Sequence, residues 1–82
     1  FRQAESTYQK AIIIYKESLG RNHPYYANSL NGLGKLYYLE NKLGKAEALF
    51  NDALKIYERS LGSNHPDIVD VLENMAILNI KD

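Results

Sequence analysis

Two histidines and two neighbouring carboxylates are among the side chains in this 82-residue chain that could do chemistry. His23 and His65 could bind a metal ion or act as general bases, and Asp67 and Asp70 are spaced to share one helix face. A metal site needs several converging ligands, yet the histidines lie 42 residues apart, each beside a proline, and the chain has no cysteine. We therefore expect no catalytic residue, no metal and no cofactor, and we assign both histidines to a structural role in a linker.

The charge balance argues against two classes of partner. Ten Lys and Arg residues offset ten Asp and Glu residues, so the formal net charge is zero. Non-specific binding to nucleic acid or to an anionic membrane draws on a surplus of basic residues. No apolar run approaches the roughly 18 residues of a membrane span. We expect no nucleic acid and no membrane partner, and the lack of cysteine favours a cytoplasmic, intracellular location.

An internal repeat organises the whole chain. Residues 19–24 read LGRNHP, and residues 61–66 read LGSNHP, which is an offset of 42 residues. The same offset aligns Leu30 with Leu72 and many other positions of matching character. The chain is thus an array of a 42-residue unit in just under two copies. Because it begins with Phe1 and not Met, we expect it to be part of a longer protein.

Each unit has the pattern of two helices. Apolar residues recur at spacings of three and four, which is typical of an amphipathic helix. Gly20 and Asn41 suit the left-handed residues that follow helices, and Pro24 suits the first turn of the next helix. Short loops make consecutive helices antiparallel, so the predicted fold is all-α. The predicted helices span residues 1–19, 24–39, 43–60 and 66–80.

Small residues recur where the helices of a pair must approach closely. Gly34 and Ala76 are equivalent, as are Ala11 and Ala53. A small side chain lets two helix backbones come together while large neighbours such as Phe50 fill the remaining volume. Overpacking at these positions should therefore destabilise the fold.

These residues resemble a known family. Residues 30–38 read LNGLGKLYY, and with Ala46, Phe50 and Ala53 they resemble a tetratricopeptide repeat, in which each unit is a helix A followed by a helix B. The 42-residue period and the LGxxHP linker resemble the long-period repeats of kinesin light chains and of related bacterial and multidomain proteins. The resemblance implies an α-solenoid with helices in the order B-A-B-A. Residues 1–19 would be helix B of a preceding repeat, 24–60 one complete repeat, and 66–80 helix A of a following repeat.

The resemblance also implies a binding face, because the A helices of such arrays line a concave surface. That surface would hold an extended peptide or a partner helix, as in an adaptor or scaffold. Gly32 stands where the family often has Asn, so it would remove one side chain from this face. The implied concave positions are Asn28, Asn31, Gly32, Lys35, Tyr38, Asp70, Glu73, Asn74, Ile77 and Lys81.

Three alternatives remain open from the sequence. The polar positions could be ordinary solvated helix faces, with the true ligand contacts in repeats outside this chain. The chain could instead be a sensor or regulatory repeat of a larger protein that contains an NTPase or a protease. It could also self-associate as a homodimer, because apolar residues on the first and last helices, such as Ile13, Leu72 and Ile80, would lack a covering helix.

Overall fold

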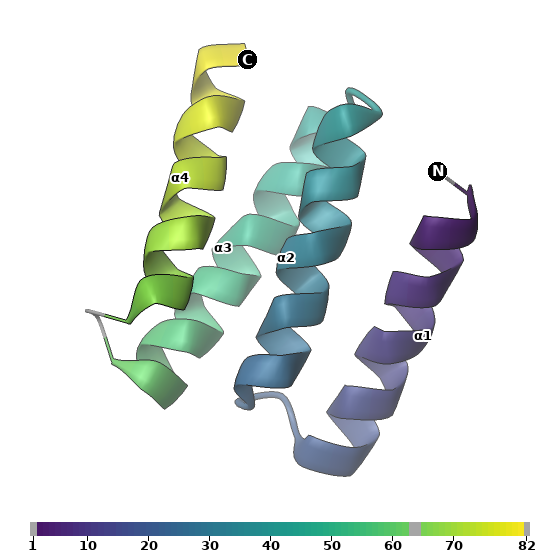
Figure 1. The fold of residues 1–82 in the computed structure, drawn as a ribbon, viewed down its shortest axis with the longest axis vertical. Coiled ribbons are helices and arrows are strands. Elements are labelled where there is room, and N and C mark those ends of the chain that lie inside the picture. Colours follow the sequence, from purple (N-terminus) through teal and green to yellow (C-terminus); the bar gives the residue numbers. More distant parts are fainter. Residues whose placement is uncertain (1, 63–64, 82) are drawn as a thin grey trace.

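A computed structural model of the chain describes residues 2–62 and 65–81, without the side chain of Lys81. It contains helices α1 (Arg2–Leu19), α2 (Pro24–Leu39), α3 (Leu43–Leu61) and α4 (Pro66–Lys81), and no strand within those ranges (Figure 1). The all-α prediction is confirmed, and α3 and α4 each end one residue later than expected. Phe1, with which the first helix was predicted to begin, and the middle of the second linker lie outside the described residues.

The helices form an antiparallel array in which each one packs on its neighbours. The tightest contact joins α2 to α3, while α1 packs on α2, α4 packs on α3, and α2 touches α4 more lightly. Figure 1 shows α3 behind α2, with α1 and α4 at opposite edges of the molecule. The array measures 32 × 30 × 16 Å. This is the arrangement of an α-solenoid with helices in the order B-A-B-A.

The hydrophobic core lies between α2, α3 and α4. Its buried apolar side chains follow the period of an amphipathic helix, and α1 contributes none of them. Tyr8 and Ile12 of α1 are partly buried and pack against this core. The α2–α3 hairpin is therefore the centre of the fold. The core residues are Ala27, Leu30, Leu33, Leu36, Tyr37, Ala46, Phe50, Ala53, Ile56, Tyr57, Ile68, Val71 and Leu78.

Two glycines in α2 permit close packing on opposite sides of that helix. A Cβ atom on Gly34 would lie 2.6 Å from Cε1 of Phe50, so the predicted role of Gly34 in helix approach is confirmed. A Cβ atom on Gly32 would overlap the ring of Tyr8 in α1. The placement of Gly32 on the concave binding face is therefore wrong. Its missing side chain makes room for the neighbouring helix and takes nothing from a ligand surface.

The histidines cap the helices that follow them. Nδ1 of His23 accepts a hydrogen bond of 3.1 Å from the backbone N–H of Tyr25, and Nδ1 of His65 accepts one of 3.1 Å from that of Asp67. Each imidazole thus satisfies one of the N–H groups that a helix start leaves without a backbone partner. The predicted structural role of the linker histidines is confirmed, and the duplication follows because each repeat needs the same cap.

The helix ends also match the predicted turn chemistry. Gly20 has φ 90° and Asn41 has φ 63°, which places both residues in the left-handed region. Glycine adopts this region without steric cost, and asparagine tolerates it better than most residues do. These two residues turn the chain back so that consecutive helices can pack side by side.

Candidate functional site

The face formed by α2 and α4 carries a polar network centred on Asn31. Its Nδ2 atom donates a hydrogen bond of 2.7 Å to Oδ2 of Asp70, and its Oδ1 atom accepts one of 3.1 Å from Nδ2 of Asn74. The residue is only 5 % exposed. Both the nitrogen and the oxygen of this side-chain amide form hydrogen bonds to residues of α4. Asn31 therefore positions the two A-type helices relative to each other.

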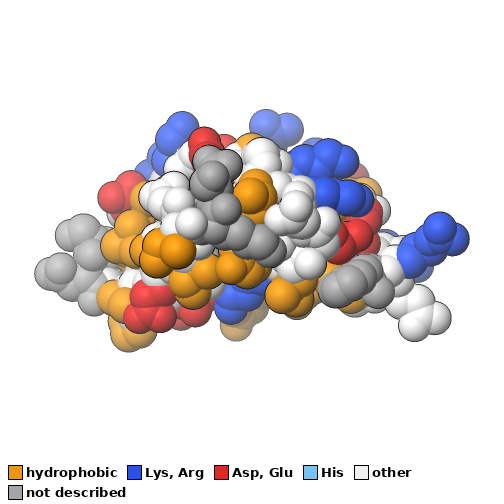
Figure 2. All heavy atoms as spheres, turned by 90° about the horizontal axis from the view of Figure 1, so that it is seen from above, with side chains coloured by type: hydrophobic (Ala, Val, Ile, Leu, Met, Phe, Trp, Pro, Cys, Tyr) orange, Lys and Arg blue, Asp and Glu red, His pale blue; other side chains and the backbone are white. Residues whose placement is uncertain are grey.

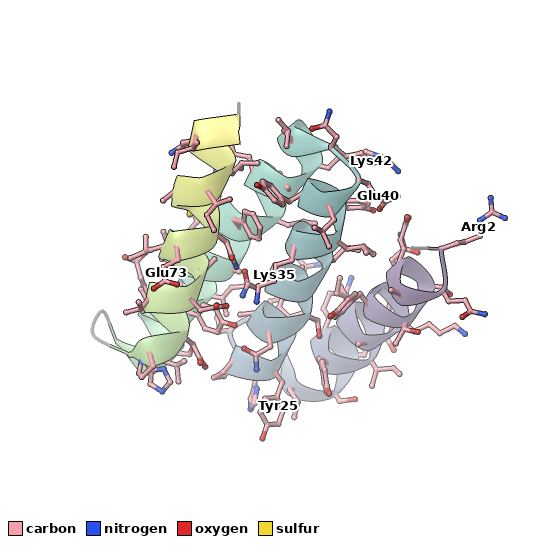
Figure 3. All side chains as sticks on the ribbon, turned by 45° about the horizontal axis from the view of Figure 1, so that its top comes forward. Arg2, Tyr25, Lys35, Glu40, Lys42 and Glu73 are labelled. Carbon is pink, nitrogen blue, oxygen red and sulfur yellow. The ribbon has the colours of Figure 1, made fainter. Side chains whose placement is uncertain are left out.

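Lys35 stands at the exposed edge of the same network. Its Nζ atom lies 3.4 Å from Oδ2 of Asp70, and about half of each side chain is exposed to solvent. An exposed ion pair of this kind contributes only about 0.2–1 kcal/mol, so the ammonium group can turn to another carboxylate at little cost. Figure 3 shows Lys35 between α2 and α4, with Glu73 on the exposed side of α4.

A small pocket opens beside this ammonium group. It has a volume of about 40 Å³ and is lined by Lys35, Tyr38, Phe50, Asn74 and Ile77. Phe50 is buried in the core, whereas Ile77 is exposed, so the pocket has an apolar floor and a partly apolar, partly charged rim. The tip of a small apolar side chain fits such a site. The sequence assigned Phe50 to packing alone, and the structure shows that this residue also lines the pocket.

Asn28 lies apart from this pocket and is held by a tyrosine of the core. The hydroxyl group of Tyr57 donates a hydrogen bond to Oδ1 of Asn28. Burial raises the pKa of Tyr57 to about 12, and the negative charges of Asp67 and Asp70 add to this effect. Tyr57 therefore remains a neutral donor over the whole physiological pH range, and it fixes the orientation of the Asn28 amide.

The predicted site residues thus fall into three groups. Asn31, Asp70 and Asn74 form the network between the helices, with Lys35 at its edge. Tyr38 and Ile77 line the small pocket, whereas Asn28 and Glu73 are exposed outside it. The predicted position Lys81 has no described side chain.

A second and larger depression lies between α1 and α2. Its volume is about 260 Å³, and tyrosines form much of its wall. The rings of Tyr15 and Tyr25 pack with their centroids 5.8 Å apart. The lining residues are Thr7, Tyr8, Ala11, Tyr15, Tyr25, Asn28 and Ser29.

Within residues 2–62 and 65–81, no three His, Cys, Asp or Glu side chains stand close enough together to hold a metal ion. None of the helices in that part of the chain combines the length and the apolar character needed to cross a lipid bilayer.

Antiparallel helices that repeat along the chain and pack mainly on the helices next to them define an α-helical repeat protein. The sequence model of the tetratricopeptide repeat family matches residues 1–59, which is most of the chain. The chain belongs to the tetratricopeptide repeat family. The comparison with curated proteins gives no significant match. Members of this family generally mediate protein–protein interactions, and their repeats are typically not enzymatic.

Proposed function

We propose that this chain is an adaptor or scaffold module that binds an extended peptide or a partner helix along the face of α2 and α4. The observation that carries this proposal is the pocket with an apolar floor beside the half-exposed ammonium group of Lys35. An apolar anchor gains from burial, and a neighbouring charge fixes its orientation. The lower edge of Figure 2 is the front of the molecule in Figure 1, where α2 and α4 lie. Hydrophobic side chains are present along this edge, together with acidic and basic ones.

The groups around the pocket indicate the chemistry of the ligand. Lys35 can pair with a carboxylate of the ligand, while Ile77 and Phe50 contact an apolar side chain next to it. Asp70 and Glu73 place negative charge on the α4 side of the face, so a purely acidic ligand is disfavoured. We infer a ligand with a small apolar anchor next to a single acidic group, laid across a face whose geometry Asn31 maintains.

We also propose that the repeat is of the long-period subtype found in kinesin light chains. The 42-residue period and the LGxxHP linker support this assignment. The residues of this linker have structural roles, because its glycine ends one helix and its histidine caps the next.

The proposed binding face of α2 and α4 is tested with peptides selected from a random display library on the wild-type chain. Their affinities are then measured by fluorescence anisotropy for wild type and for Ile77→Glu and Lys35→Ala. We expect Ile77→Glu to weaken binding at least about tenfold, since a buried apolar contact typically contributes more than about 1.4 kcal/mol. Lys35→Ala should weaken acidic peptides selectively.

The matched control is Lys55→Ala, which removes an exposed lysine of α3 away from this pocket. This variant should bind as wild type does. Equal peptide affinities for the wild type and Ile77→Glu, with helical content preserved in both, would contradict the proposed binding face.

A further inference from the structure

The outward face of α4 is apolar and exposed, although its repeat equivalent is buried. Val69 is 51 % exposed and Leu72 is 48 % exposed. The equivalent residues 42 positions earlier are Ala27 and Leu30, which are 0 % and 5 % exposed in the core beside α3. The exposed face of α4 therefore has the position and the character of a surface that a B-type helix covers.

The outward face of α1 has the complementary character. Ile14 is 57 % exposed, and its repeat equivalent Ile56 is 7 % exposed in α3. Ala4 is likewise exposed, whereas its equivalent Ala46 is fully buried. The exposed face of α1 thus corresponds to the surface that α3 presents to an A-type helix.

We propose that a second copy of this chain docks head to tail, with its α4 on α1 of the first copy. This contact would repeat between two chains the packing that α2 and α3 already make within one chain. The two outer helices have complementary net charge, since α1 carries one more basic than acidic residue and α4 carries two more acidic than basic residues. Figure 1 shows α1 and α4 at opposite edges of the molecule, and the two helices do not contact each other within one chain.

A polar contact of the fold supports the same register. Within the chain, the Tyr57 hydroxyl donates to Oδ1 of Asn28. The repeat equivalents of this pair across the new interface are Tyr15 and Asp70 of the second copy. A carboxylate is a stronger acceptor than an amide oxygen, and it has enough acceptor sites to keep its bond from Asn31.

The depression between α1 and α2 is the space that the incoming helix would cover. Tyr8, Ala11 and Tyr15 line it, and their repeat equivalents Phe50, Ala53 and Tyr57 are buried in the core. The equivalence thus accounts for both the size and the apolar wall of the 260 Å³ depression. The copy that docks there supplies the cover that α2 gives to α3, since α2 already packs on α1 as α4 packs on α3.

Two substitutions make this contact weaker than the internal one. Ala76 is the repeat equivalent of Gly34, whose lack of a side chain leaves room for the Phe50 ring. Asn79 is the repeat equivalent of Tyr37, which is buried in the core. We therefore expect association that depends on protein concentration. Because the two faces differ, the interface is heterologous and leaves one open face at each end, so longer oligomers follow at high concentration.

The test uses one variant for each face, Leu72→Glu on α4 and Ile14→Glu on α1, studied by sedimentation equilibrium over a wide concentration range. The wild type should rise above the monomer mass of 9.4 kDa as its concentration increases. Each variant alone should remain a monomer, because one of its two faces is blocked. An equimolar mixture of the two should form a 1:1 complex and nothing larger, because each variant keeps one intact face.

Ile13→Glu is the matched control, because its repeat equivalent, Lys55, is itself exposed on α3. This variant should associate as wild type does. The proposal is overturned if the wild type stays monomeric at the highest concentration. It is also overturned if either single variant still pairs with itself, or if the mixture stays monomeric while circular dichroism shows both variants folded.

Discussion

Tyr57 combines a fully buried ring with a hydroxyl group that reaches Asn28 on the neighbouring helix. Its pKa is raised to about 12 by burial and, to a smaller extent, by Asp67 and Asp70. The neutral hydroxyl is therefore part of the folded state, and ionising it requires either a charge in the core or the opening of that core.

The raised pKa predicts a loss of stability at alkaline pH. An unfolded tyrosine loses its proton near pH 10.0, whereas folded Tyr57 keeps its proton up to about pH 12. Between these values the unfolded chain binds fewer protons than the folded chain, so the free energy of unfolding falls as the pH rises. Urea unfolding followed by circular dichroism across this interval measures the slope.

Tyr57→Phe is the control, because it removes this hydroxyl group and leaves every other residue as in the wild type. The wild type should lose stability more steeply than this variant. Parallel pH profiles for the two proteins would show that Tyr57 ionises as freely in the folded chain as in the unfolded one.

The histidines show how far single residues can be interpreted from the sequence. Their duplication in equivalent linkers predicts a structural role, and the structure confirms it. The cap itself could not be predicted, because helix caps are usually Ser, Thr, Asp or Asn. The imidazole serves here because the extended backbone of His23, at φ −95° and ψ 140°, points Nδ1 at the N–H two residues ahead.

At the scale of the helix pair, Gly34 sets how closely α2 and α3 approach. An alanine inside a helix normally stabilises it by up to about 1 kcal/mol relative to glycine. At position 34, however, the added methyl group would lie 2.6 Å from the Phe50 ring, which is fixed within the core. Steric overlap in a packed core costs about 1–3 kcal/mol, which outweighs the gain in helix propensity.

We therefore predict that Gly34→Ala lowers the free energy of unfolding, as measured by urea titration. Gly44→Ala is the matched control, since nothing lies within 4 Å of a Cβ atom on Gly44 in α3, and this change should be neutral or stabilising. Combining Gly34→Ala with Phe50→Leu should cost less than the two single changes added together. Stabilisation by Gly34→Ala alone would mean that the ring moves aside freely.

Gly32 marks the limit of prediction at this scale. Helix periodicity predicts the existence and ends of all four helices, and their bounds agree with the structure to within one residue wherever the chain is described. It does not give the rotation of α2 between its two neighbours. Gly32 lies against the ring of Tyr8 in α1, a contact that the spacing of the apolar residues alone does not reveal.

At the scale of the whole molecule, Asn31 joins one repeat to the next. It bonds to Asp70 and Asn74, whereas the direct contact between α2 and α4 is otherwise light. The sequence predicts that these residues share a face, because the repeat aligns their helices. It does not predict their hydrogen bonds. The repeat equivalents of Asp70 and Asn74 are Asn28 and Gly32, so the other repeat gives no second example of this pairing.

Asn31→Asp tests this junction. The new carboxylate would stand within hydrogen-bonding distance of Asp70, and two like charges there raise the pKa values of the pair. We predict a loss of about 1–3 kcal/mol in the free energy of unfolding at neutral pH. Part of this loss should be recovered as the pH falls and the pair takes up a proton.

Lys35→Met is the comparison, because it removes only the exposed ion pair with Asp70 and should cost less than about 1 kcal/mol. Urea unfolding at neutral and acidic pH measures both variants. An Asn31→Asp deficit that does not change with pH would show that the two carboxylates do not interact.

The absence of any buried side chain in α1 has a consequence for cooperativity. A helix held on one side by the partly buried Tyr8 and Ile12 can detach and rejoin while the central hairpin stays intact. Local opening should thus begin at this end and spread inward, so that the backbone amides of the middle helices are the last to exchange with solvent. The molecule is then graded in rigidity along its length, and its most mobile helix carries one of the two surfaces at which another copy would dock.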